Sequence, residues 1–178
     1  MMKTQTLLIA LALLLAPPVW AQAPAAAAEY AVKSALLYKL PRFIYLPNLQ
    51  DGQALQLCVL GESPFGGALQ KLAQTPIDGR KVAVQHPQNS KQALDCDLLF
   101  IARSEAAQLK TTLSALSQTA VVTISDIEGF AKAGGMLEMA LDADGKGALS
   151  ILINRKAAQA HGIQFNAQLL RLAKIVEP

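Results

Sequence analysis

The sequence AVVTISDIEGFAKAGGMLEMA, residues 120–140, decides the fold of this chain. Residues 121–124 are all β-branched and predict a buried strand, and the apolar residues 136–141 predict a second strand. Between them, Ser125 and Asp126 can cap a short helical turn, and paired glycines allow backbone dihedrals that other residues resist. We therefore predict two buried strands joined by a compact turn.

Upstream of this stretch, apolar runs of strand length alternate with segments of helical period. The predicted strands are residues 54–60, 81–85 and 98–101; the predicted helices are residues 65–73 and a segment capped by Ser104. An earlier helix is expected to begin at Glu29, and Pro41 should kink or end it near residue 40 because proline removes a backbone hydrogen bond.

Downstream, residues 142–147 predict a hairpin turn and residues 148–153 its return strand, followed by a helix that Asn154 caps and a final helix at 167–176. Alternating strands and helices favour a parallel sheet covered on both faces. The predicted fold class is α/β, a three-layer sandwich with a mainly parallel, Rossmann-like sheet plus an antiparallel hairpin at the edge.

The first residues have the pattern of a signal peptide, with Lys3 in a polar start and an apolar run at 7–16 that is too short to span a membrane. We expect residues 1–23 to be the signal peptide, cleaved after Ala21 or Ala23, residues 24–28 to be a disordered tail, and 29–178 to form a single domain. The leader would then send the chain to an oxidising compartment, without membrane insertion after cleavage. Without Lys3 the chain has fifteen basic and thirteen acidic residues and no long basic run, so nucleic acid is not an expected partner.

Two cysteines, Cys58 and Cys96, remain in a chain that is expected to reach an oxidising compartment. A disulfide is the default interpretation; two buried thiols or a redox pair are the alternatives. The cysteines and the distant His86 and His161 lack the spacing of a metal site, so we predict no metal and no cofactor.

The first helix carries four candidate partner-binding residues, Tyr30, Leu37, Tyr38 and Phe43. Core packing explains these side chains more simply, but so apolar a helix could also contact a partner protein or a second copy of the chain, giving a homodimer.

Weak candidates for ligand binding are Ser63 and Gly66, in a loop between a strand and a helix, and Ser125 and Asp126. Capping of a helix by Ser63, and of the turn by Ser125, explains the same residues without a ligand. Adjacent residues such as Ser125 and Asp126 cannot form a catalytic triad, so we predict that the protein is not an enzyme.

A series of short motifs runs along nearly all of the mature chain: Glu29-Tyr30-x-Val32-Lys33-x-Ala35-Leu36-Leu37-Tyr38, Gly61 with Pro64-Phe65-Gly66, Cys96-x-Leu98-Leu99-Phe100-Ile101, Thr123-Ile124-Ser125-Asp126, Gly129-Phe130-Ala131, Gly134-Gly135-Met136, Ile153-Asn154 and Leu169-Leu170-x-Leu172-Ala173. In the order and spacing of these motifs, the sequence resembles the YfiR-like family. The chain departs from the family pattern at Tyr45-Leu46-Pro47, where the first helix ends without a tryptophan.

The resemblance implies a periplasmic regulatory protein that binds and represses the periplasmic sensory portion of a membrane-bound diguanylate cyclase of the YfiN type. Such a repressor would control cyclic-di-GMP and biofilm output. The alternative is a periplasmic small-molecule-binding sensor domain that does not repress a cyclase.

Overall fold

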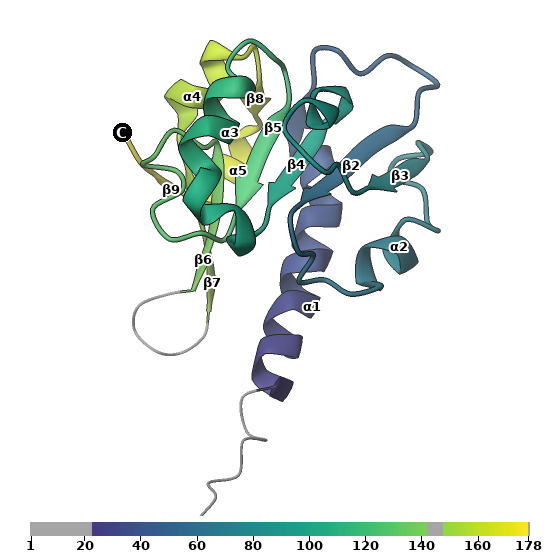
Figure 1. Ribbon diagram of the computed structural model, residues 1–178. Coiled ribbons are helices and arrows are strands. Elements are labelled where there is room, and N and C mark those ends of the chain that lie inside the picture. The colour runs from purple at the N-terminus through teal and green to yellow at the C-terminus, as the bar shows by residue number, and fades with distance from the viewer. Residues whose placement is uncertain (1–22, 142–147, 178) are drawn as a thin grey trace, which may run out of the picture.

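The computed structural model describes residues 23–141 and 148–177 (Figure 1). The expected signal peptide up to residue 22 and the expected hairpin turn at 142–147 lie outside the described residues. Within the described part of the chain, no helix is long and apolar enough to cross a membrane.

Seven strands form the main sheet, in the order β3-β2-β4-β5-β6-β7-β9. Their bounds are β2 Leu55–Leu60, β3 Val82–Gln85, β4 Leu98–Ile101, β5 Val122–Ser125, β6 Leu137–Leu141, β7 Leu149–Ile153 and β9 Lys174–Ile175. Within the described residues, β6 and β7 pair antiparallel and every other pair in this sheet is parallel. A separate antiparallel pair joins β1 (Ile44–Tyr45) to β8 (Gln164–Phe165). The predicted α/β class, with a mainly parallel sheet and a late antiparallel hairpin, is confirmed.

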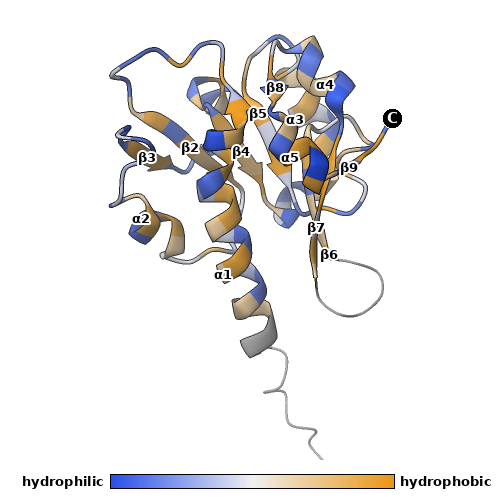
Figure 2. Cartoon of the chain, turned by 180° about the vertical axis from the view of Figure 1, so that it is seen from behind, coloured by the Kyte–Doolittle hydropathy of each residue, from blue (hydrophilic) through white to orange (hydrophobic). Residues whose placement is uncertain are grey.

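Helices cover both faces of the main sheet (Figures 1 and 2). The helices are α1 Ala23–Lys39, α2 Ala68–Leu72, α3 Leu109–Ala115, α4 Arg155–Ala160 and α5 Ala167–Leu172, with 3-10 turns η1 Leu40–Phe43, η2 Gln92–Asp95 and η3 Arg103–Gln108. Alternate strand residues face the two layers: Leu57 and Phe100 pack in the larger cluster, with α1 and α5, while Leu99 and Ile101 pack in the smaller one, beneath α3. The core therefore has two apolar layers separated by the sheet.

Two local predictions are confirmed because each depends only on residues that are close in the chain. Helix α1 ends at Lys39, and Pro41 follows in η1, where the lack of an N–H matters little. Asn154 caps α4, since its side chain accepts a hydrogen bond from the backbone N–H of Ala157.

Four local predictions are wrong. Residues 24–28 belong to α1, because a run of alanines has the highest helix propensity and is continuous with the helix that follows. Helix α2 is shorter than 65–73 and has no side-chain cap from Ser63. Ser104 caps no helix; its hydroxyl instead accepts a hydrogen bond from the backbone N–H of Glu62 at 2.9 Å.

The last of the four corrections concerns the C-terminal segment. Helix α5 ends at Leu172, and the next residues form β9, which adds to β7 in parallel. The backbone N–H of Val176 donates to the carbonyl of Ile153 at 3.0 Å, so sheet pairing overrides the helical pattern there.

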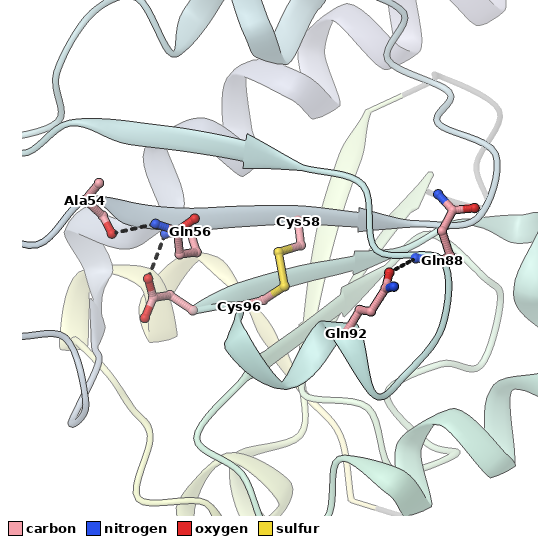
Figure 3. The surroundings of a disulfide bond; sticks show 7 residues. Ala54, Gln56, Cys58, Gln88, Gln92 and Cys96 are labelled. Carbon is pink, nitrogen blue, oxygen red and sulfur yellow. Dashed lines mark hydrogen bonds between the residues drawn. A yellow bond between two sulfur atoms is a disulfide. The ribbon is translucent and has the colours of Figure 1, made fainter.

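A disulfide joins Cys58 in β2 to Cys96 at the entrance to β4 (Figure 3). The two cysteines are 38 residues apart, and both are buried. The adjacent Asp97 accepts a hydrogen bond from the backbone N–H of Gln56 at 2.7 Å, so β2 and β4 are tied by a covalent bond and a polar contact at the same level. The default interpretation of the cysteines holds in this structure.

Candidate functional site

The carboxyl ends of β2, β4 and β5 lie side by side at one edge of the sheet. After β2 the chain forms β3 on one side of β2 and then crosses to form β4 on the other side, and α/β sheets commonly bind ligands where the strand order reverses in this way. Here the loops that follow β2 and β4 are in contact, since the backbone N–H of Glu62 donates to Oγ of Ser104 at 2.9 Å. A Cβ atom on Gly61 would lie 2.5 Å from Oγ of Ser104, so only glycine fits.

Asp126, directly after β5, is the centre of a buried polar cluster at this edge. Its side chain is fully buried, and its Oδ2 accepts hydrogen bonds from the Tyr30 hydroxyl at 2.8 Å and from Nζ of Lys33 at 2.7 Å. Arg103, which follows β4, places a guanidinium nitrogen 3.2 Å from the same oxygen. One carboxylate oxygen thus joins α1 to two strand ends.

Lys33 has no exposed surface, which is rare for a lysine and requires a counter-ion. Besides Asp126, it contacts the carboxylate of Glu29 one helical turn earlier, and its Nζ lies 4.8 Å from the centre of the Tyr30 ring. Arg103 is 3.8 Å from Glu29. Two cations and two carboxylates therefore balance in the cluster, and removing one group would leave a buried charge.

Tyr30 links this polar cluster to the apolar core. Its ring makes an edge contact with Phe65, which in turn makes one with Phe100 of β4. Partial burial, and then the hydrogen bond to the negatively charged Asp126, raise the pKa of Tyr30 to about 12. The phenol is therefore a hydrogen-bond donor and not a base at ordinary pH.

Oδ1 of Asp126 is buried and has no hydrogen-bond partner within the described residues. A cavity of about 450 Å³ lies beside Asp126, and charged side chains contribute to its wall, namely those of Arg103, Asp126, Glu128, Lys132 and Glu138. An unpaired buried acceptor is costly, roughly 1–3 kcal/mol, so a donor that reached Oδ1 would bind favourably.

Glu138 and Ser125 are not available for chemistry in this cavity. The two carboxylate oxygens of Glu138 accept the backbone N–H groups of Gly129 and Ala131, at 3.1 and 3.0 Å, and hold the turn after β5 in place. The Ser125 hydroxyl donates to the carbonyl of Ile101 at 2.7 Å and so ties β5 to β4. The Ser125 hydroxyl bonds to Ile101 while the Asp126 carboxylate bonds to Tyr30 and Lys33, so the structure shows no hydrogen bond that would make Ser125 and Asp126 a nucleophile and base pair.

The structure separates the predicted site residues. Tyr30 and Asp126 meet in the polar cluster, although the sequence suggested one for a partner and the other for a ligand. Ser63 accepts a long hydrogen bond, 3.4 Å, from the N–H of Phe65, and Gly66 is exposed with a φ of 51°. Neither lies in the wall of the cavity beside Asp126.

The other three predicted residues of α1 and its extension lie against the core. Leu37 is fully buried, and Tyr38 is 8% exposed, with its hydroxyl donating to the carbonyl of Thr75. Phe43 is half-buried against the larger core cluster. Among the large apolar side chains of α1 whose burial the structure describes, Val32 is the exposed one, at 57%.

Sequence reasoning missed Lys33, Glu29 and Arg103 as members of the cluster. Lys33 could have been found, because it stands between Tyr30 and Leu37 at the three- and four-residue spacing that forms the buried stripe of a helix. A lysine in that stripe requires a buried anion. Arg103 has no comparable signal, since it reaches the cluster only through the pairing of β4 with β5. No group of three or more His, Cys, Asp and Glu residues that could hold a metal occurs in the described residues.

Comparison with known proteins assigns this architecture to a family. A family model described as YfiR/HmsC-like matches residues 30–174, and no curated protein matches the chain. Two solved structures share the fold: the ABC domain in complex with L-Trp from Streptococcus pneumoniae (TM-score 0.54, 13% identity) and a conserved domain protein from Vibrio cholerae O1 biovar El Tor (TM-score 0.57, 14% identity). Each alignment covers 83% of this chain and 60% of the other, so this chain spans less than two thirds of either protein.

Proposed function

This chain belongs to the YfiR/HmsC-like family, and from that membership we propose that it is a periplasmic regulator that binds the periplasmic sensory portion of a membrane-bound diguanylate cyclase and represses it. The observation that carries the proposal is the extent of the family match, which runs from Tyr30 in α1 to Lys174 in β9. The match therefore includes Tyr30, Lys33, Arg103 and Asp126 of the polar cluster, but not Glu29, and nearly all of the sheet.

Repression would act by a shift in populations, without turnover of a substrate. A regulator that binds one state of the cyclase more tightly than the other favours that state by the difference in binding free energy. Cyclic-di-GMP, and with it biofilm formation, would rise when the regulator dissociates. This mechanism needs a rigid binding surface, and the disulfide and the buried cluster give α1 and the strand ends fixed positions.

We propose that α1 contributes to this binding surface. Tyr30 and Phe43 are half-buried and can add contact area, whereas Leu37 and Tyr38 would act by holding the helix in place. The exposed Val32 offers α1 an apolar contact with a partner, or with a second copy in a homodimer, which sedimentation velocity would test.

The test is a pulldown from solubilised membranes with the mature protein, residues 22–178, followed by mass spectrometry and a cyclase assay on the captured material. We expect a membrane-bound cyclase whose rate of cyclic-di-GMP synthesis falls as the protein is added. Capture of no cyclase, or of one whose rate is unchanged, would contradict repression.

A small-molecule sensor is the second candidate function, and the unpaired Oδ1 of Asp126 beside a cavity of about 450 Å³ favours it. Thermal unfolding against a panel of nucleotides and amino acids tests this function, because a ligand at a hundred times its Kd adds about 2.7 kcal/mol of stability. The variant to compare with wild type is Lys132→Ala, because Lys132 lines the cavity but is not part of the buried ion pairs. A ligand that stabilises wild type and this variant equally binds elsewhere.

A further inference from the structure

The positive charge of this chain is concentrated in its last elements. Residues 155–177 carry four basic residues, Arg155, Lys156, Arg171 and Lys174, and one acidic residue, Glu177. That excess equals the formal net charge of the whole chain, +3, because the remaining twelve basic and twelve acidic residues balance. Within the described residues, no ion pair includes Arg155, Lys156 or Arg171, whereas Lys174 already has a partner in the chain.

Exposed apolar side chains occur in the same segment. Leu172 is 74% exposed, more than any other large apolar residue in the described part of the chain, and Ile175 is 46% exposed. Ile175 lines a cavity of about 540 Å³ together with Arg155 and Lys156 at the start of α4 and with Glu177, so two cations and one carboxylate contribute to its wall. We call Arg155, Lys156, Arg171, Leu172 and Ile175 the basic corner.

The basic corner also contains an open edge of the sheet. Strand β9 pairs with β7 on one side and is the last strand in the order of the sheet. The backbone N–H and C=O groups of successive strand residues point to opposite sides of the strand. Since the N–H of Val176 points to β7, the backbone groups of its neighbour Ile175 point to the open side. Figure 1 shows β9 beside the C-terminus and away from α1. An extended segment of another protein can pair with such an edge.

We propose that the basic corner docks an extended acidic segment of the periplasmic portion of the cyclase, with apolar residues of that segment against Leu172 and Ile175. This inference rests on the proposed function and adds the surface and the chemistry of the partner. Unpaired cations around exposed apolar groups match a segment of opposite charge and similar apolarity. A membrane surface is a poorer partner for two reasons. Two apolar side chains, Leu172 and Ile175, bind a membrane weakly, and a peptide can form hydrogen bonds with the open backbone groups of β9 whereas lipid cannot.

The test compares two charge-reversed variants in the membrane pulldown. In the docking variant, Arg155→Glu and Lys156→Glu reverse the charge at the first turn of α4, where acidic side chains favour the helix, so folding is preserved. In the control, Lys71→Glu and Lys110→Glu change the net charge equally at exposed positions of α2 and α3. We expect the docking variant to bind the captured cyclase at least about tenfold more weakly than the control.

A second measurement identifies the partner segment. A photocrosslinking amino acid at Leu172 should label a cyclase peptide that contains several Asp or Glu residues, and sodium chloride should weaken capture by wild type. Three outcomes would each overturn the inference while leaving repression intact. They are equal capture by both variants, a crosslink to a peptide without acidic residues, and binding of wild type to anionic phosphatidylglycerol vesicles that the docking variant loses. Capture of no cyclase by wild type would instead overturn the proposed function, and this inference with it.

Discussion

Replacing Lys33 with methionine would leave the buried carboxylate of Asp126 without its closest cation. Both side chains are fully buried and 2.7 Å apart, and removing one partner of such a pair typically costs about 3–5 kcal/mol. Arg103 still lies 3.2 Å from the carboxylate and offsets part of this loss, although its side chain is 58% exposed and its charge is screened by water. We therefore expect a loss of about 3 kcal/mol, at the lower end of the range.

Urea unfolding followed by circular dichroism, with the disulfide intact, measures this loss. For a domain of this size it corresponds to a fall in Tm of roughly 6–12 °C. The double variant Lys33→Met with Asp126→Leu removes both buried charges, so it should unfold within about 1 kcal/mol of wild type. Asp126→Leu alone should likewise cost about 3 kcal/mol, so the double-mutant cycle gives a coupling of about 5 kcal/mol between the two side chains.

The matched control is Arg42→Met, which breaks an exposed ion pair with Asp78. That pair has a similar distance, 3.0 Å, but its side chains are 48% and 66% exposed, so the expected loss is under about 1 kcal/mol. If Lys33→Met cost no more than Arg42→Met, or the cycle gave a coupling below about 0.5 kcal/mol, the buried cluster would not be what holds α1 to the sheet.

Three further changes test other features of the structure. Replacing Cys58 and Cys96 by serine should lower the free energy of unfolding by about 4 kcal/mol on the chain-entropy model for a 38-residue separation, and titration of the native protein should find no free thiol. Because burial and a neighbouring carboxylate raise the pKa of Tyr30 to about 12, its contribution to stability is complete below pH 10 and lost as the pH rises from about 10 to 12; Tyr30→Phe should lack this part of the fall in urea midpoints. Gly135→Ala places a Cβ 2.0 Å from a buried phenylalanine ring and should destabilise by about 1–3 kcal/mol, whereas Gly67→Ala, with open space around it, should change stability by less than 1 kcal/mol in the same assay.

Local chemistry accounts for what could be predicted about the fold. The strands that became β4, β5 and β6 are short apolar runs between polar turns, and such runs are buried in almost any compact arrangement. Pro41 and Asn154 act through their own backbone or on an N–H three residues away, so their effects follow from sequence alone.

Two of the four errors have a clear physical origin. Residues 24–28 looked too small and apolar to be ordered, but alanine needs no tertiary contact to continue a helix that is anchored further along. The end of the predicted last helix became β9 because the exposed edge of β7 offered backbone partners, and that edge exists only in the assembled sheet.

The sequence by itself determined the α/β class, the apolar strands and the presence of a cysteine pair, because each depends on residue types and short spacings. Only the tertiary structure decided that Tyr30, Lys33 and Arg103 meet at one oxygen of Asp126, since these residues lie on three elements that are distant in the chain. The same holds for the basic corner, where the start of α4 meets β9. Charges from separate elements become a cluster or a surface only when strand pairing and helix packing bring those elements together.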